Sequence, residues 1–223
     1  EEMWVEGSRF HHLFRVRRLR RGEAVRLTDG EGRARWAEVS VVESERARLV
    51  LGRAAPTNEA PIGVHLAVAT PRATRVSWLV EKGTELGVGS FRFFSCERAP
   101  RRMHSAGVER LRRVASAALE QSGRSLLPVI EAGLDFAALE KHLKSCERSV
   151  LLDPASPTPF VGAAAASSWL VVGPEGGFTP AESARLHAVT TVSARLGPSI
   201  LRIETAALAA SSLLLFGPQE SES

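Results

Sequence analysis

The stretch LVVGPEGGFTPAE, residues 170–182, joins an apolar run to a glycine-rich turn and the start of a helix. The apolar residues are of the kind buried on both faces of a parallel sheet. Thr179, Pro180 and Glu182 give three agreeing helix-start signals: a threonine N-cap, proline at the first helical position and a glutamate that closes a capping box. A buried strand that leads through glycines into a helix predicts an α/β domain with a ligand at its strand ends.

The turn GPEGG, residues 173–177, differs from the common phosphate-binding loops. It lacks the Lys-Ser/Thr pair of the P-loop and the G-x-G-x-x-G spacing of the dinucleotide fingerprint. Glu175 would repel a phosphate, whereas a carboxylate suits a ribose hydroxyl or a cationic ligand, such as an adenosyl group on a sulfonium. A tight left-handed turn without a ligand is the alternative interpretation of this loop.

A second loop of the same kind occurs in LGPSILRIETA, residues 196–206, where a strand end opens through Gly-Pro into a helix. Two such loops at strand carboxyl ends would form one crevice, the usual ligand site of open α/β sheets. Arg202 and Glu204 are its ionisable residues. An ion pair within the protein at the helix start is the alternative, because acids favour helix N-termini.

Strands alternate with helices after residue 61, which indicates an α/β fold. We predict strands at 62–69, 90–94, 149–153 and 168–173, and helices at 75–86, 108–119 and 204–216. The last helix is apolar or small on every side, which suits burial within the domain or against a second subunit.

The first sixty residues instead show short alternating runs, AVRLT, RARWAEV and ARLVL, with a hairpin signal at Asp29-Gly30. AAPTNEAP, residues 54–61, has the prolines and polar residues of a linker. We therefore expect domains at 1–60 and 61–217, followed by a disordered tail at 218–223.

The basic charge of the chain is concentrated in two clusters. The pI is about 9.8 and the net charge +4. Six arginines and no acid lie between residues 9 and 21, and six more with one glutamate between 98 and 113. Such clusters are typical of a polyanion partner, although a solvated basic face is the alternative.

The chain has no apolar run near the roughly 20 residues that cross a bilayer, and its start lacks a signal-peptide layout. We therefore expect a cytoplasmic protein with no membrane contact. Cys96 and Cys146 have neither CxxC nor Cys/His spacing, so no disulfide framework and no metal site is predicted.

Five motifs, in this order and spacing, resemble the bacterial 16S rRNA uracil-N3 methyltransferase family (RsmE) of the SPOUT superfamily. They are RFHHLFRVRRLRRGEAVRLTDGEG from Arg9, KGTELGV from Lys82, EQSGR from Glu120, GPEGGFTPAE from Gly173 and LGPSILRIETA from Leu196. The resemblance implies a SPOUT α/β domain with a C-terminal trefoil knot, preceded by a small PUA-like β-barrel that binds RNA, in a homodimer. Knots are rare exceptions to topology rules, so periodicity cannot predict this one.

The resemblance also implies the cofactor S-adenosylmethionine, held by the two loops. The residues implied to bind it are Val172, Gly173, Pro174, Glu175, Gly176, Gly177, Leu196, Gly197, Ile200, Leu201, Thr205 and Ala206.

The substrate implied by the resemblance is one uridine of 16S rRNA in the small ribosomal subunit, conventionally numbered 1498. Arg202 or Arg124 would stabilise the uracil anion as N3 loses its proton, and Glu204 would accept that proton. No metal is needed. RNA contacts are expected from Arg9, His12, Arg15, Arg17 and Arg98.

The start EEMWVEGSRF departs from the arginine-rich, aromatic start that is usual in the family. Two alternative functions stay open. One is another SPOUT RNA methyltransferase that acts on tRNA or on a ribose 2′-hydroxyl, and the other is a non-catalytic RNA-binding or ribosome-assembly factor.

Overall fold

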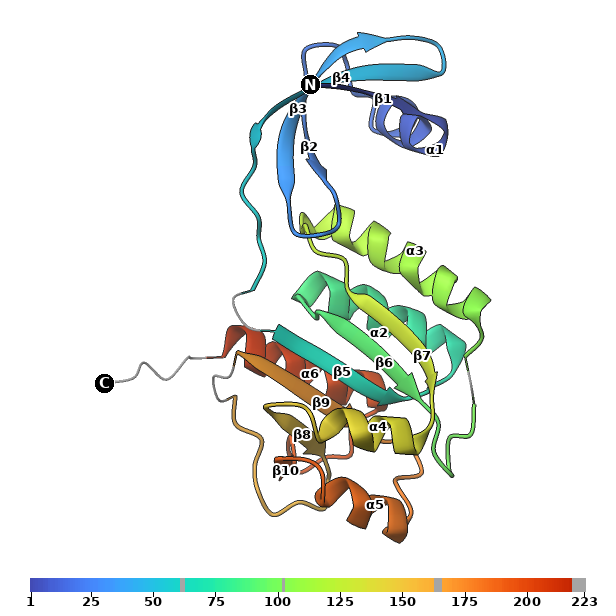
Figure 1. The fold of residues 1–223 in the computed structure, drawn as a ribbon, viewed down its shortest axis with the longest axis vertical. Coiled ribbons are helices and arrows are strands. Elements are labelled where there is room, and N and C mark those ends of the chain that lie inside the picture. Colours follow the sequence, from blue (N-terminus) through green and yellow to red (C-terminus); the bar gives the residue numbers. More distant parts are fainter. Residues whose placement is uncertain (61–62, 102, 163–165, 218–223) are drawn as a thin grey trace, which may run out of the picture. The chain divides into compact units, whose positions relative to one another are not determined.

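The computed structural model describes residues 1–60, 63–101, 103–162 and 166–217 (Figure 1). The chain forms two compact units. The first contains Glu1–Glu59 together with Arg124–Leu126, and the second contains the described residues from Ala60 to Gly123 and from Leu127 onward. The tail predicted at 218–223 lies outside the described residues, as do Ile62 and Arg102.

The second unit is built on a six-stranded sheet of order β10-β8-β9-β5-β6-β7. Every neighbouring pair is parallel, which confirms the predicted α/β class. The strands are β5 (Gly63–Ala69), β6 (Ser90–Phe94), β7 (Val129–Leu134), β8 (Ser149–Leu152), β9 (Ser167–Val172) and β10 (Val192–Ala194).

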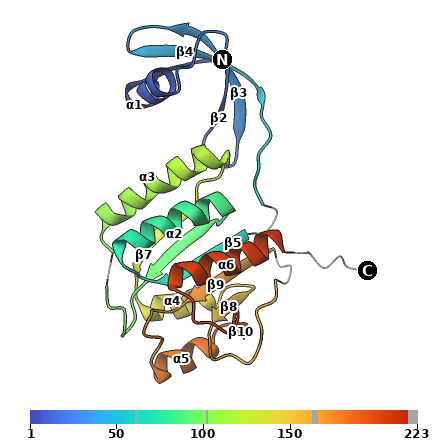
Figure 2. The ribbon, with the colours of Figure 1, turned by 180° about the vertical axis from the view of Figure 1, so that it is seen from behind.

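Helices cover both faces of this sheet, as its apolar strands require. One face is covered by α2 (Ala73–Leu86), α3 (Ser105–Ser122) and α6 (Ile203–Phe216), which Figure 2 shows from behind. The other face is covered by α4 (Phe136–Leu143) and α5 (Pro180–His187). Among the residues described, no helix is both long and apolar enough to span a bilayer.

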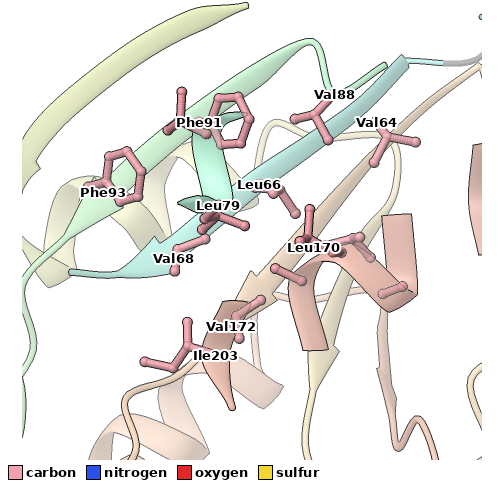
Figure 3. Packing of buried hydrophobic residues seen from close by; sticks show 14 of the residues in the cluster. Val64, Leu66, Val68, Leu79, Val88, Phe91, Phe93, Leu170, Val172 and Ile203 are labelled. Atoms are coloured by element: carbon pink, nitrogen blue, oxygen red, sulfur yellow. The ribbon is translucent and has the colours of Figure 1, made fainter. Parts of the chain in front are cut away.

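The main core lies between the sheet and the first set of helices. Val64, Leu66 and Val68 of β5 point to this face, as their period of two predicts, and meet Leu79 of α2 (Figure 3). A Cβ added at Gly83 would lie 2.7 Å from the Phe91 ring, so this glycine lets α2 approach β6 closely. Gly83, the first glycine of KGTELGV, is therefore explained by the close packing of α2 on β6.

The first unit is a four-stranded antiparallel sheet of order β1-β4-β3-β2. Its strands are β1 (Glu2–Glu6), β2 (Ala24–Thr28), β3 (Ala34–Val42) and β4 (Arg46–Ala54). A short helix α1 (Gly7–Phe10) continues into a π-helical turn η1 (His11–Val16), which sequence analysis did not predict. Phe10 and Phe14 from this segment stack at 5.1 Å between ring centroids and pack on the sheet core.

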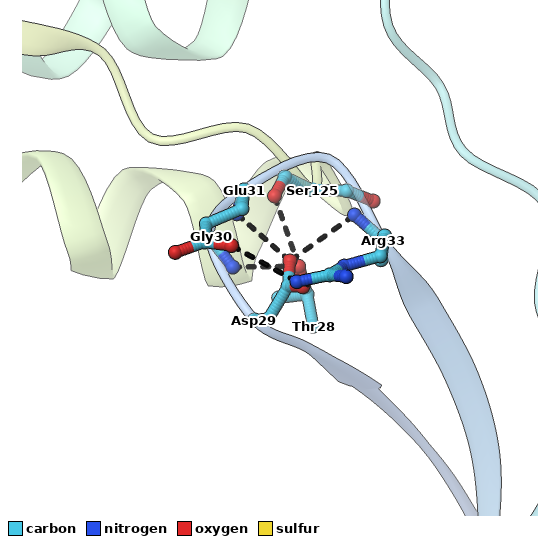
Figure 4. Close-up of polar contacts among 6 residues, drawn as sticks. All are labelled: Thr28, Asp29, Gly30, Glu31, Arg33 and Ser125. Atoms are coloured by element: carbon cyan, nitrogen blue, oxygen red, sulfur yellow. Dashed lines mark hydrogen bonds and ion pairs between the residues drawn. The ribbon is translucent and has the colours of Figure 1, made fainter.

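The hairpin predicted at Asp29-Gly30 is confirmed, and its loop runs from Asp29 to Arg33 (Figure 4). The Asp29 carboxylate accepts hydrogen bonds from the backbone N–H of Glu31 and of Arg33. Ser125, far along the chain, accepts at its carbonyl from the Thr28 hydroxyl and from the N–H of Gly32, both at 3.0 Å. The loop of this hairpin is therefore completed by the segment Arg124–Leu126.

Candidate functional site

The first predicted loop follows β9 and leads into α5. The N–H of Gly177 bonds the carbonyl oxygen of Pro174 at 2.8 Å, and Gly177 has a φ of +70°, a conformation that favours glycine. A Cβ at Gly173 would lie 2.7 Å from the Phe178 ring. Gly177 is thus favoured by the turn and Gly173 by packing against Phe178, and the binding of a cofactor by this loop stays a prediction.

Glu182 anchors this loop at its helical end. The predicted capping box is confirmed, because Thr179 and Glu182 exchange the expected hydrogen bonds. The second carboxylate oxygen of Glu182 accepts from the N–H of Glu97 at 2.8 Å. Burial has the largest single effect on the pKa of Glu182 and raises it. The N–H of Glu97 and the two donors of Thr179 more than offset this effect, so the pKa of Glu182 lies below its usual value.

Arg98, predicted to bind RNA, contacts the same loop. Its guanidinium Nη1 donates to the carbonyl oxygen of Gly176 at 2.6 Å. Its Cδ would lie 3.5 Å from a Cβ at Gly176, so the side chain runs along the loop backbone. Arg98 therefore supports the predicted cofactor loop, and its contact with RNA stays a prediction.

The second predicted loop connects β10 to α6. Arg195 fixes its beginning by donating to the carbonyl oxygens of Ser156 and Pro157. Ile200, next to the start of the helix, leaves 86% of its surface exposed. A Cβ at Gly197 would meet nothing within 4 Å, so there is open space beside the loop. This loop offers backbone and apolar surface to a ligand.

Arg202 and Glu204 lie at the start of α6, where they were predicted. Arg202 is the N-cap residue and is exposed. The Glu204 side chain retains only 9% of its exposure, and its Oε2 has no hydrogen-bond partner among the described residues. Thr205 is exposed and Ala206 half-buried. A buried acceptor without a donor points to a group that is absent from the chain itself.

Arg75 joins the two loops, and sequence analysis missed it. It lies in the first turn of α2, where its Nη1 is 2.8 Å from Glu175 Oε1 and its Nε is 3.6 Å from Glu204 Oε1. The sequence signal was only that of an amphipathic helix, because Arg75 and Glu175 are 100 residues apart. The structure thus brings together Glu175, Glu204 and an unpredicted cation.

Arg124 is placed differently from the other predicted catalytic residues. It belongs to the first unit, is 5% exposed, and donates to Glu59 Oε2 from Nη2 at 2.6 Å and from Nε at 3.1 Å. The N–H groups of Ser125 and Leu126 bond Glu59 Oε1. The Arg124 guanidinium is thus paired with Glu59 within the first unit, and its catalytic role stays a prediction.

The remaining residues predicted to bind RNA lie on α1 and η1 of the first unit and, in the case of Arg17, directly after η1. Arg9, His12 and Arg17 are exposed. Arg15 is exposed too, donates to the carbonyl oxygen of Ser44, and lies with its guanidinium 5.5 Å from the centre of the Phe10 ring. One helical segment thus presents a group of cations to solvent.

Comparison with known proteins identifies the family. Residues 58–215 match the model of an RNA methyltransferase domain, and residues 5–52 match that of an RNA methyltransferase PUA domain. Ribosomal RNA small subunit methyltransferase E of Bacillus subtilis is 30% identical, over 95% of this chain and 89% of the relative. The chain belongs to the ribosomal RNA small subunit methyltransferase E family. The resemblance seen in its five motifs is confirmed.

Two other members of this family and one protein that is more distantly similar extend the comparison. The Mycobacterium tuberculosis enzyme of the same name is 32% identical, over 92% of this chain and 83% of its own. Methyltransferase E of Neisseria gonorrhoeae, solved bound to S-adenosyl methionine, superposes with a TM-score of 0.84 at 25% identity and covers 95% of this chain and 90% of its own. The Aquifex aeolicus TrmH/SpoU enzyme, at a TM-score of 0.50 and 12% identity over 72% of this chain and 77% of its own, shares the fold alone. The predicted SPOUT class and PUA-like N-terminal region are thereby confirmed.

Proposed function

We propose that this protein transfers the methyl group of S-adenosylmethionine to N3 of one uridine, conventionally 1498, of 16S rRNA in the small ribosomal subunit. Membership of the methyltransferase E family supports the reaction class. The buried, unpartnered Oε2 of Glu204, between two loops at the strand ends, is the observation that carries the proposal.

The residues present fit this cofactor. S-adenosylmethionine bears an ammonium, a sulfonium, ribose hydroxyls and an adenine ring, and when bound it supplies an electrophilic methyl group. The second loop offers open space beside Gly197 and exposed apolar surface at Ile200 and Leu201 for a ring. The carboxylates of Glu175 and Glu204 would suit the cationic and hydroxyl groups. The residues that would hold the cofactor are Val172 to Gly177, Leu196, Gly197, Ile200, Leu201, Thr205 and Ala206.

Proton removal from the base is the step that this chain's own residues would perform. N3 of neutral uracil carries a proton and lies on the pairing edge, so the uridine must be unpaired to react. Glu204 would accept that proton as N3 becomes nucleophilic. Arg202, exposed at the start of α6, would stabilise the negative charge that develops on a uracil oxygen.

Substrate docking and assembly complete the proposal. The exposed Arg9, His12, Arg15 and Arg17 would contact rRNA phosphates, with Arg98 closer to the loop.

We further propose domains at 1–60 and 61–217, with the trefoil knot of the superfamily in the second. A homodimer would cover apolar side chains that α2 and α6 expose, among them Trp78, Leu213 and Phe216. Cytoplasmic localisation would follow from the rRNA substrate.

The test is transfer of labelled methyl from S-adenosylmethionine to small subunits that lack the modification, followed by mass spectrometry of the nucleosides. We expect 3-methyluridine at one position. Label in another nucleoside would refute the proposed target, and binding without transfer to any rRNA particle would favour an assembly factor. Arg202→Ala should abolish transfer while the affinity for S-adenosylmethionine, measured by calorimetry, is retained.

A further inference from the structure

Three charged side chains meet where α2, the loop after β9 and the start of α6 come together. Arg75 lies between Glu175 and Glu204, at 2.8 and 3.6 Å from their nearest oxygens. Its side chain is 29% exposed, compared with 52% for Glu175 and 9% for Glu204. Arg75 is thus a half-buried cation that links a carboxylate at the surface to one that is almost enclosed.

The fold places Arg75 in the first turn of α2, a position that does not favour a cation. The residue is in the first turn of α2, because the N–H groups of Arg75 and Val76 both bond the carbonyl oxygen of Arg72. This turn follows the carboxyl end of β5, which is the same edge of the parallel sheet as the two loops. A positive charge near a helix N-terminus is opposed by the helix dipole. The two carboxylates compensate for that repulsion.

Glu204 depends on Arg75 for charge compensation. A carboxylate removed from water needs a cation or hydrogen-bond donors. The strands β5 and β9, which pack on α6, contribute the apolar side chains of Val64, Leu66, Val68, Leu170 and Val172 to the core that they share with this helix. The helix α2 presents Arg75. Arg202, the N-cap residue of α6, is exposed.

The arrangement also distinguishes the two oxygens of Glu204. Oε1 faces the Arg75 guanidinium, whereas Oε2 is buried and has no partner among the residues described. A carboxylate held by one oxygen leaves its second oxygen in a defined direction. The orientation of the carboxylate thus depends on Arg75.

We propose that Arg75 is a positioning residue for methyl transfer, which orients the Glu204 carboxylate and ties the Glu175 loop to α6. The inference rests on the proposed function. Arg75 acts through Glu204, so it need not touch the rRNA or the cofactor.

Arg75→Met removes the charge and keeps much of the side-chain volume. We expect kcat at neutral pH to fall by about 10²-fold, because general base catalysis contributes about 10²- to 10⁴-fold. The KM for rRNA should stay within about twofold of the wild-type value, since Arg75 is not proposed to contact the substrate.

Arg75→Lys provides a second variant in case the methionine variant does not fold. It keeps the positive charge but lacks the planar guanidinium that can reach two carboxylates. We expect an intermediate kcat and a pH–rate profile close to that of the wild type. Arg185→Met is the matched control, because Arg185 also pairs with a glutamate, Glu140, but on the opposite face of the sheet. Its kcat and pH profile should be unchanged.

A double-mutant cycle separates positioning from a general structural effect. In a Glu204→Gln background, Arg75→Met should have no further effect on kcat, because the group through which it acts is gone. The inference would be overturned if Arg75→Met lowered kcat by the same factor in the wild-type and Glu204→Gln backgrounds. It would also be overturned by an Arg75→Met variant with wild-type kcat and pH profile. If the wild-type protein forms no 3-methyluridine, the proposed function itself fails, and this outcome is distinguished by the wild-type assay alone.

Discussion

Replacing Glu59 by glutamine tests how the segment Arg124–Leu126 is held in the first unit. The Glu59 carboxylate accepts four hydrogen bonds, two from the Arg124 guanidinium and one each from the N–H groups of Ser125 and Leu126. The Arg124 side chain is 5% exposed and that of Glu59 20%. An amide has one acceptor oxygen and no charge, so it can keep the backbone bonds and not those to Arg124.

The expected cost follows from these four bonds. A hydrogen bond to a charged group contributes about 1.5–3 kcal/mol, compared with about 0.5–1.5 kcal/mol for a neutral one. Losing both bonds to the guanidinium, each near the lower end of this range, gives about 3–4 kcal/mol, within the roughly 3–5 kcal/mol known for breaking a buried ion pair. At about 1.4 kcal/mol per factor of ten, the local opening equilibrium should increase by about 10²- to 10³-fold.

Amide hydrogen exchange reads this change directly, because two of the donors are backbone amides. In Glu59→Gln, the amides of Ser125 and Leu126 should exchange about 10²-fold faster or more, while amides in β5 are unaffected. Glu31→Gln is the matched control, since Glu31 pairs with Arg33 in the same unit but at the surface. Exchange at Ser125 and Leu126 within threefold of the wild-type rate would refute the proposed anchoring.

Three further predictions concern stability. Burial has the largest single effect on the pKa of Glu59 and raises it, but the hydrogen bonds from Ser125, Arg124 and Leu126 together lower this pKa below its usual value. The stabilising effect of Glu59 is therefore complete above the usual glutamate pKa and is lost as the pH falls through the lowered value. Acid unfolding of the first unit should accordingly be less steep in Glu59→Gln. Thr179→Ala removes the cap of α5 and should cost about 1 kcal/mol, read from the urea midpoint. Gly83→Ala places a Cβ 2.7 Å from the buried Phe91 ring and should cost about 1–3 kcal/mol in the same assay.

Each of these predictions has a result that contradicts it. An unchanged acid profile in Glu59→Gln would mean that Glu59 binds protons equally in both states. An unchanged midpoint in Thr179→Ala would show that the cap hydrogen bond contributes nothing net. A more stable Gly83→Ala would show that α2 can move away from Phe91 without loss of packing.

Local patterns predicted most of the second unit. The period of two in β5, the capping box at Thr179 and the amphipathic repeat of α3 each reflect contacts within a few residues, and all appear in the structure. The glycine loops could be recognised because strand, turn and helix-start signals occur in succession. The π-helical turn η1 could not be predicted, because the stretch RFHHLFRVRR has no signal that separates it from a strand or an ordinary helix.

The charged part of the candidate site could be predicted only in part. Glu204 was visible as an acid at a helix start, but its burial and its unpartnered oxygen depend on packing against α2. Arg75 gave no signal, because its partners are 100 and 129 residues further along the chain. The pairing of Arg124 with Glu59 could not be predicted, because Glu59 lies in a stretch with the composition of a linker.

The discontinuity of the first unit has a consequence for the order of folding during synthesis. The hairpin loop and Glu59 are made early, but Arg124, Ser125 and Leu126, their partners, follow about 65 residues after Glu59. At about 5–20 residues per second, the ribosome needs about 3–13 s to supply them. The nascent sheet must persist over this interval with an acidic side chain still unpaired, so a fragment that ends at residue 60 should be less stable than the same residues in the finished chain.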